Sequence, residues 1–394
     1  LCTFPSNMVD SVVTDPPYGL SREPDIREVL EKWLAGEDYT HRGSGFIGKT
    51  WDSFVPGPSI WREVYRVLKP GGHALVFAGT RTQDLMTIAL RLAGFEVRDV
   101  IAWLYFGGFP KSMDVSKAFD KKFGAERTEV IGKSNSKGIR SGSGNYVGDD
   151  YKQKGYDITA PVTDEAKQWD GWGTALKPAH EPIIVLRKPL IGTVTENVER
   201  FGTGTINIDG CRIGDEEVRS SGEVSNAWRE AEGRTDRQTP NPSVNIGRFP
   251  ANCVTTEPDA FFSPYFNVTP KHLCKKASKK DRNSDWRGEE IALEEKRAGC
   301  MQATVNGSML TGSGNERKTV YRNTHPTVKP TDLMTWLVRL ITPPGGIVLD
   351  PFAGSGSTCV AARREGFFFI GIERELEYVE IARKRAGEID TVPG

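Results

Sequence analysis

Short apolar runs alternate along this chain with longer segments in which apolar residues return every three or four positions. The runs have the continuity of strands that are covered on both faces, and the periodic segments have the spacing of amphipathic helices. The runs lie at 12–13, 74–77, within 95–106, 183–186, 347–349 and 367–372, and the periodic segments at 60–68, 85–92, 333–341 and 378–386. This alternation predicts an α/β fold, a Rossmann-like doubly wound and mainly parallel sheet with helices on both faces.

The pattern fails from about Gly192 to Asn323, where turn residues and charges dominate. A chain of 394 residues is long for one compact core, so we expect an inserted irregular region here. A disordered insert is the alternative, but aromatic residues argue against disorder throughout. These are Phe249, Phe261, Phe262, Tyr265 and Phe266.

A glycine-rich segment follows the strand at 347–349 and is the first candidate site. Its sequence is Asp350-Pro351-Phe352-Ala353-Gly354-Ser355-Gly356-Ser357-Thr358. The two glycines permit a tight turn and a close approach to a ligand, and Ser357 and Thr358 are good caps for a helix running to Arg364. Glu373 ends the next strand, where an acid can accept hydrogen bonds from ribose hydroxyls.

This segment is neither a phosphate-binding P-loop, because the lysine is missing, nor a good dinucleotide fingerprint, because the third glycine is missing. The order of strand, glycine turn, helix, strand and acid therefore favours binding of a nucleoside-bearing cofactor. A bare structural turn is the alternative.

The second candidate site is Asp15-Pro16-Pro17-Tyr18, directly after the strand at 12–13. Open α/β sheets bind ligands at the carboxyl ends of their strands. The prolines stiffen the chain and leave carbonyl oxygens free to accept, so Asp15 and Pro16 offer two acceptors suited to an amino group. Tyr18 adds a flat face for stacking on a base. A plain strand-to-turn junction is the alternative.

Together the two motifs resemble the S-adenosylmethionine-dependent amino-methyltransferases of DNA, in which Asp-Pro-Pro-Tyr is catalytic and a Phe-x-Gly-x-Gly loop binds the cofactor. Their order is similar to that of the β class. His325-Pro326-Thr327-Val328-Lys329-Pro330 also stands directly before the helix leading to the cofactor strand, as in that class. The resemblance implies that S-adenosylmethionine contacts residues 350–358, Glu373, His325, Thr327, Lys329 and Pro330.

Three further segments, 51–58, 107–112 and 175–182, resemble phage and prophage adenine-specific members. The resemblance assigns residues 1–191 to the catalytic half of the methyltransferase domain, 192–323 to a target-recognition region and 324–394 to the cofactor-binding half. The family normally has a Gly-Asp-Cys-like cofactor segment before the catalytic strand. The sequence begins at Leu1 without it, so we expect a truncated start.

The net charge is zero, but five lysines without an acid gather between 271 and 280. Such runs are usually solvated loops, yet beside a nucleobase site they are candidates for phosphate contacts. The predicted DNA-binding residues are Lys271, Lys275, Lys276, Lys279 and Lys280. Residues 36–48 are expected to form a mobile loop over the flipped base or a plain surface connection.

The six cysteines include no Cys-x-x-Cys pair, which argues against a zinc site and against disulfides. A metal-ligand role for Cys274, His272 and Cys300 is the alternative to the expected absence of a metal. No apolar run approaches membrane-spanning length, so we expect a cytoplasmic enzyme without a membrane partner. The resemblance implies that it is bacterial or phage-encoded. The irregular region has too little periodic structure to bury all of its aromatic residues within one subunit, and exposed apolar patches usually mark interfaces. We therefore expect a homodimer, as the resemblance also implies.

The expected function is site-specific transfer of a methyl group from S-adenosylmethionine to N6 of adenine in double-stranded DNA. The target atom is unreachable inside a duplex, so the base must be flipped out onto Tyr18. N4-cytosine methylation presents the same amine geometry and remains open. So do an RNA or protein-amide substrate and a catalytically inactive DNA-binding protein that keeps the fold.

Overall fold

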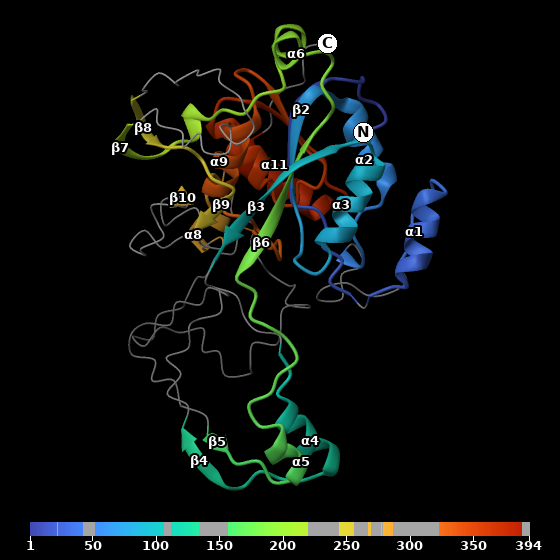
Figure 1. Cartoon of the computed structure of the whole chain (residues 1–394), viewed down its shortest axis with the longest axis vertical. Coiled ribbons are helices and arrows are strands. Elements are labelled where there is room, and N and C mark those ends of the chain that lie inside the picture. Colours follow the sequence, from blue (N-terminus) through green and yellow to red (C-terminus); the bar gives the residue numbers. More distant parts are fainter. Residues whose placement is uncertain are drawn as a thin grey trace, which may run out of the picture.

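A computed structural model describes residues 1–21, 23–41, 52–105, 112–133, 157–219, 244–255, 267–268, 277, 279–286 and 323–387 (Figure 1). The described residues form an eight-stranded central sheet. In sheet order its strands are β10 (Asn267–Val268), β9 (Cys253–Thr255), β3 (Glu96–Leu104), β6 (His180–Arg187), β2 (Leu68–Phe77), β1 (Val9–Thr14), β11 (Ile347–Asp350) and β12 (Phe368–Gly371).

Most neighbouring strands of this sheet run parallel, and β6 runs antiparallel to both β2 and β3. The predicted Rossmann-like, doubly wound and mainly parallel sheet is therefore confirmed. Because β6 is reversed, its first residues lie at the same edge of the sheet as the last residues of β1 and β2.

Successive residues of each central strand face opposite cores. Val12 belongs to one hydrophobic cluster and Val13 to the other. The first cluster packs under α2 (Pro58–Val67) and α3 (Gln83–Leu92), with α1 (Ile26–Leu34) beside them. The second packs under α9 (Thr331–Ile341) and α10 (Ser357–Arg364), and α11 (Leu376–Ala386) contacts α10. The blue helices and the red helices of Figure 1 thus cover opposite faces of the sheet.

Two strands differ from the expectation. β2 begins at Leu68, which was expected to belong to the preceding helix, and it includes the Pro-Gly-Gly stretch before the expected strand at 74–77. Within this stretch the Pro70 carbonyl accepts from Asn197 Nδ2 at 3.0 Å and from Thr203 Oγ1 at 2.6 Å, and Gly71 turns the backbone with a φ of +77°. β12 was expected to be buried, but it is the edge strand of the sheet and Phe368 is 58% exposed.

The predicted irregular region contains short elements that join the main body. β9 pairs with β3, and β10 pairs with β9. α6 (Val194–Phe201) packs on β2, and the short 3-10 helix η3 (Asp209–Cys211) packs on α9. β7 (Ile213–Arg219) and β8 (Val244–Arg248) form a separate antiparallel ribbon, and α8 (Lys279–Arg282) follows later. The division at residues 192 and 323 stays a prediction.

A small lobe between β3 and β6 was not predicted. It contains α4 (Val115–Phe123), β4 (Val130–Lys133), β5 (Asp157–Thr159) and α5 (Asp164–Gln168), and it lies apart from the sheet in Figure 1. Its centre is polar: the buried carboxylate of Asp120 accepts from Arg127 Nε at 2.6 Å and from the backbone N–H of Thr163 at 2.9 Å.

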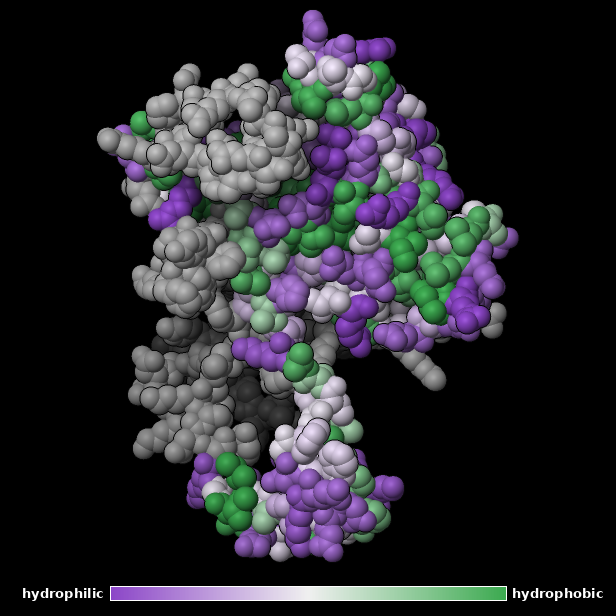
Figure 2. All heavy atoms as spheres, in the orientation of Figure 1, coloured by the Kyte–Doolittle hydropathy of each residue, from purple (hydrophilic) through white to green (hydrophobic). Residues whose placement is uncertain are grey.

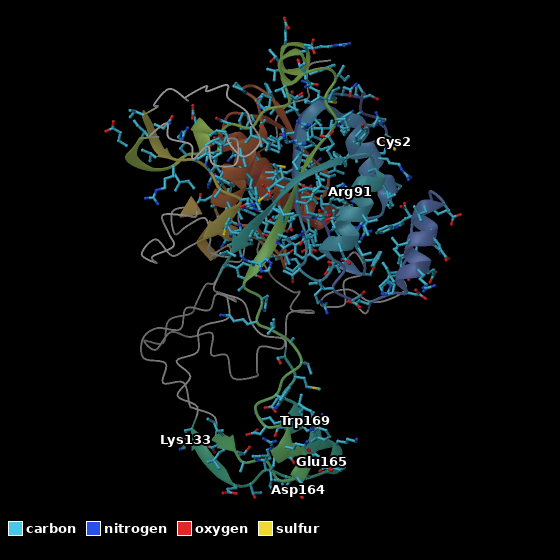
Figure 3. All side chains as sticks on the ribbon, in the orientation of Figure 1. Cys2, Arg91, Lys133, Asp164, Glu165 and Trp169 are labelled. Atoms are coloured by element: carbon cyan, nitrogen blue, oxygen red, sulfur yellow. The ribbon has the colours of Figure 1, made fainter. Side chains whose placement is uncertain are left out.

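The surface of this lobe is mainly hydrophilic, with hydrophobic side chains gathered over β4, where Val130 and Ile131 are exposed (Figure 2). Asp164 and Glu165 lie at its outer end (Figure 3). No helix of the described residues is long and apolar enough to span a membrane. Nor do those residues bring three or more potential metal ligands together.

Candidate active site

Three charged side chains from distant parts of the chain meet at the carboxyl end of β1. Asp15 follows β1, Glu181 lies at the start of β6, and Lys329 precedes α9. Lys329 Nζ lies 2.7 Å from Asp15 Oδ2 and 3.3 Å from Glu181 Oε2. The side chains of Asp15, Glu181 and Lys329 are only 19%, 14% and 10% exposed, so water screens these charges weakly.

Asp15 has one satisfied and one unsatisfied oxygen. Its Oδ2 accepts from Lys329, whereas its buried Oδ1 has no hydrogen-bond partner among the residues that the structure describes. Burial raises the pKa of Asp15, and repulsion from Glu181 adds to this, while the Lys329 ammonium opposes both. A buried oxygen without a donor is costly, so a ligand N–H that reaches it gains a strong hydrogen bond.

Tyr18 is fixed by its backbone as well as by its hydroxyl. Asp52 Oδ1 accepts from the backbone N–H of Tyr18 at 2.9 Å, and Thr82 Oγ1 donates to the Tyr18 carbonyl at 2.6 Å. The phenol donates to Glu181 Oε2 at 3.0 Å. Burial, together with the Asp15 and Glu181 charges, raises the pKa of Tyr18 well above its usual value. The Asp-Pro-Pro-Tyr turn is therefore rigid, with a neutral phenol.

Gly19 explains how the turn closes after Tyr18. Its φ is +66°, and a Cβ at this position would lie 2.9 Å from the backbone nitrogen of Val55. Only glycine adopts this conformation while letting the backbone of the 54–55 segment come so close.

Lys329 is part of the charged cluster, although it was expected among the cofactor contacts. Its Nζ lies 5.1 Å from the ring centroid of Tyr18 and 4.9 Å from that of Phe77. Burial disfavours its charge, but the carboxylates of Asp15 and Glu181 outweigh burial and raise the pKa of Lys329. Lys329 is therefore a fixed, charged donor at the proposed catalytic motif, and its cofactor contact stays a prediction.

Asp350 connects the two sequence motifs. It is 3% exposed, and its carboxylate accepts from Thr14 Oγ1 and from Thr358 Oγ1, both at 2.6 Å, and from the backbone N–H of Phe352 at 3.1 Å. Burial raises the pKa of Asp350 to about 6. These contacts join the residue before Asp15 to the glycine loop, and the expected contact of Asp350 with the cofactor stays a prediction.

The glycine loop turns as expected, but protein groups fill the space beside its glycines. Gly354 and Gly356 have φ of +51° and +77°. A Cβ on Gly354 would lie 2.9 Å from His325 Nε2, and one on Gly356 would lie 3.0 Å from the Cβ of Ala382. The two glycines therefore allow His325 and Ala382 to pack closely against the backbone of the loop.

The expected caps of α10 are wrong. Gly356 is the N-cap, without a side-chain hydrogen bond. The Thr358 hydroxyl instead donates to Asp350, and Ser357 Oγ accepts from Arg385 Nη1 at 3.2 Å. Both hydroxyls are drawn to charged groups inside the molecule, which bind them more strongly than the free N–H groups of the first turn.

Glu373 lies beyond β12, close to the glycine loop. Its Oε2 accepts from the backbone N–H of Gly354 at 2.8 Å, and its Oε1 accepts from the N–H groups of Arg374 and Glu375, both at 2.9 Å. A carboxylate has about four acceptor sites, so this one retains capacity for a further donor such as a ribose hydroxyl. The hydrogen bond from Gly354 thus orients the Glu373 carboxylate beside the glycine loop.

His325 is buried and neutral. Burial lowers its pKa to about 4, although the hydrogen bond to the Thr327 carbonyl opposes this shift. That bond, 2.7 Å long, requires the proton on Nδ1 because a carbonyl can only accept. The ring packs edge-on against Tyr378 with centroids 4.4 Å apart, and its Nε2 faces Gly354. The expected cofactor contact of His325 stays a prediction.

Three contributors were missed by sequence reasoning. Arg385, fully buried in α11, donates to the Ser355 carbonyl at 2.7 Å and so holds the glycine loop. Arg282 donates to the His325 carbonyl at 3.0 Å. The sequence pointed to Glu181 only through its place in the family-like segment 175–182. Nothing in the sequence pointed to the two arginines, because the carbonyls that they bind lie far away along the chain.

Several predicted residues cannot be placed. Lys271, Lys275 and Lys276 lie outside the described residues, as do the side chains of Lys279 and Lys280. The same holds for most of the expected loop at 36–48 and for the metal alternative of His272, Cys274 and Cys300. Their roles stay predictions.

The sequence is similar to proteins of one known family. A model of N6/N4 methyltransferases, described as DNA methylase, matches residues 9–384. The type II methyltransferase M2.DpnII of Streptococcus pneumoniae is 47% identical over 75 residues, which are 19% of this chain and 28% of that protein. M2.LlaDCHI of Lactococcus lactis subsp. cremoris is 43% identical over 75 residues, with the same shares. The match thus spans little more than a quarter of these relatives.

Solved structures are similar at lower identity. The complex of M1.HpyAVI with SAM has 14% identity and a TM-score of 0.36, covering 97% of this chain and 90% of that one. The cytosine-N4-specific PvuII DNA methyltransferase has 14% identity and a TM-score of 0.40, covering 99% and 83%.

Proposed function

We propose, on the premise that this chain belongs to the DNA methylase family, that it transfers a methyl group from S-adenosylmethionine to N6 of adenine at a specific site in duplex DNA. The observation that carries this proposal is the buried, unsatisfied Oδ1 of Asp15 at the carboxyl end of a central strand. This oxygen can accept a hydrogen bond, and an exocyclic amino group of a base can donate one.

The amino nitrogen of a base is a poor nucleophile because its lone pair is conjugated with the ring. Asp15 Oδ1 and the Pro16 carbonyl would accept its two N–H groups and favour a more pyramidal nitrogen. The carboxylate would also stabilise the positive charge that develops as the methyl group arrives. The bond between the methyl group and sulfur would break as the bond to nitrogen forms, and the nitrogen would then release one proton to water. Rigid backbone around Tyr18 contributes alignment, which an in-line displacement needs more than it needs a strong base.

The residues around the glycine loop fit the cofactor. S-adenosylmethionine supplies an activated methyl group and carries ribose hydroxyls. Glu373 retains acceptor capacity beside Gly354, and the loop is fixed by Arg385 and His325. The hydrogen bond from Thr14 to Asp350 joins the residue before Asp15 to the start of this loop. The two reacting groups would thus be brought together by parts of one rigid sheet edge.

The target base would be flipped out of the duplex and stacked on Tyr18. The lysines between 271 and 280 would contact phosphates without regard to sequence. Both roles are proposals that rest on the family and on residue chemistry.

N4-cytosine methylation is the second candidate. Both bases present an amino group to Asp15 in the same way, and the family model that matches the chain includes both activities. The described residues contain no contact that separates a purine from a pyrimidine.

The test is direct product analysis. The protein is incubated with S-adenosylmethionine and genomic DNA from an unmethylated host, and the DNA is digested to nucleosides and analysed by mass spectrometry. We expect N6-methyl-2′-deoxyadenosine from the unmodified protein and no methylated nucleoside from the Asp15→Ala variant. N4-methylcytosine would transfer the proposal to the second candidate, and no methylated nucleoside in any DNA would reject both.

A further inference from the structure

Lys329 has more hydrogen-bonding capacity than its protein contacts use. A lysine ammonium carries three donors. One is directed at Asp15 Oδ2, 2.7 Å away, and a second at Glu181 Oε2, 3.3 Å away. The ammonium is held between these carboxylates and over two aromatic rings, so the direction of its remaining donor is fixed.

The Asp15–Lys329 pair places an acceptor beside a donor. The Watson–Crick edge of adenine presents the complementary pair, an N6 amino donor beside the N1 acceptor. Cytosine presents the same pair with N4 and N3. Guanine and thymine present the reverse order at the corresponding position, a carbonyl acceptor beside an N–H donor.

We propose that Lys329 donates its third hydrogen bond to the ring nitrogen adjacent to the target amino group, while Asp15 accepts from that amino group. This inference rests on the proposed function and deepens it, because it assigns recognition of an amidine edge to one charged pair. A keto base in this pocket would set its N–H against the ammonium and its carbonyl against the carboxylate. The site would thereby reject guanine and thymine by repulsion as well as by the loss of two hydrogen bonds.

Glu181 has a supporting place in this arrangement. It accepts from the Tyr18 hydroxyl at 3.0 Å and pairs with Lys329. It therefore ties the stacking residue to the donor, so that the plane of the stacked base and the position of its ring nitrogen are set together. Glu181 is a positioning residue that acts through Lys329 and Tyr18.

The test uses base analogues in duplex oligonucleotides that contain the methylation site. In one duplex the target adenine is replaced by 1-deazaadenine, which has C–H in place of N1. In a control duplex it is replaced by 7-deazaadenine, which keeps the Watson–Crick edge. Single-turnover methylation by the unmodified enzyme should fall roughly tenfold to a hundredfold on 1-deazaadenine, the scale of one hydrogen bond to a charged group, and little on 7-deazaadenine.

The variant Lys329→Met supplies the other half of the comparison. It should be slower on adenine, and its loss of rate on 1-deazaadenine should be smaller than that of the unmodified enzyme, because the contact is already gone. Any change in intrinsic amine reactivity caused by the analogue affects both enzymes equally and cancels.

Lys329→Met alone leaves Asp15 and Glu181 without a counter-ion, so a charge-matched variant is needed. The double variant Lys329→Met, Glu181→Gln removes one positive and one negative charge and keeps the net charge of the cluster. Its loss of rate on 1-deazaadenine should also be smaller than that of the unmodified enzyme.

An equal loss on 1-deazaadenine in the unmodified enzyme and in both variants would overturn the role of Lys329 and leave the proposed function intact. Absence of methylation on any DNA would instead overturn the proposed function, and this inference with it. If the methylated base is cytosine, 3-deazacytosine takes the place of 1-deazaadenine, with the same expectations.

Discussion

The hydroxyl of Thr14 donates to Asp350 at 2.6 Å across two neighbouring parallel strands. Thr14 immediately precedes the proposed catalytic Asp15, and Asp350 begins the glycine loop. The carboxylate at the centre of this contact is deeply buried and receives a second hydroxyl from Thr358. Its protonation therefore affects the junction of the two halves of the site.

Asp350 predicts a pH dependence of stability. Burial raises its folded pKa to about 6 from 3.8. The folded state then binds more protons than the unfolded chain between these values, so the free energy of unfolding should fall as pH rises from about 4 to about 6 and stay level above. The size of the fall from this group is about 3 kcal/mol at most.

Asp350→Asn should remove this component, since its amide does not titrate. The measurement is urea unfolding of both proteins between pH 4 and 8. A difference in unfolding free energy between them that is constant over this range would contradict the prediction.

Asp15→Ala should lower the methyl-transfer rate roughly a hundredfold or more while cofactor and DNA binding stay nearly unchanged, because a preorganised acceptor for the developing charge is lost. Single-turnover kinetics and a filter-binding assay measure the two effects. Asp15→Asn keeps an acceptor oxygen and should retain part of the rate. Full activity of the alanine variant would exclude the mechanism.

Glu373→Ala should weaken S-adenosylmethionine binding by about 1–3 kcal/mol, because the ribose hydroxyls lose a charged acceptor and the N–H of Gly354 loses its partner. Titration calorimetry measures the affinity. Glu380→Ala, an exposed glutamate of the nearby α11, is the control and should bind normally. Equal affinities in the two variants would remove Glu373 from the cofactor site.

Gly356→Ala should cost more stability than Gly366→Ala. The two glycines have nearly the same φ, +77° and +76°, so an alanine at either position would adopt the same unfavourable φ. A Cβ on Gly356 meets Ala382 at 3.0 Å, whereas one on Gly366 meets nothing within 4 Å. The difference in unfolding free energy should be about 1–3 kcal/mol, the cost of overpacking. Thermal or urea unfolding checks it, and equal losses would show that α11 shifts without cost.

A homodimer remains predicted. Phe249, one of the aromatic residues expected at an interface, is 65% exposed, while Phe261, Phe262, Tyr265 and Phe266 lie outside the described residues. Light scattering at micromolar concentration should give about twice the monomer mass of 43.6 kDa. A single species of monomer mass, with and without DNA, would disprove it.

Local patterns predicted the parts of the molecule that depend on neighbours in sequence. The strand, glycine turn and helix at 347–364 needed only an apolar run, two glycines and a helix-forming stretch. The unpredicted lobe shows the limit of that approach. Its centre is the Asp120 carboxylate with Arg127 and Thr163, and a polar core leaves no apolar periodicity to detect.

The site itself was predicted in part for the same reason. Asp15 and Tyr18 follow a visible strand, but nothing nearby in the sequence announces that Lys329 and Glu181 join them. Their meeting depends on strand order, and above all on the reversed direction of β6, which brings the start of a strand to the edge where parallel strands end.

The reversal of β6 also makes the length of the lobe independent of the order of the strands in the sheet. The chain leaves the sheet after β3 and returns at the start of β6, and both points lie at one edge. Residues inserted between them alter neither the order of the strands nor their registers. The lobe can therefore change in length without moving Glu181, the second residue of β6, from its place beside Lys329.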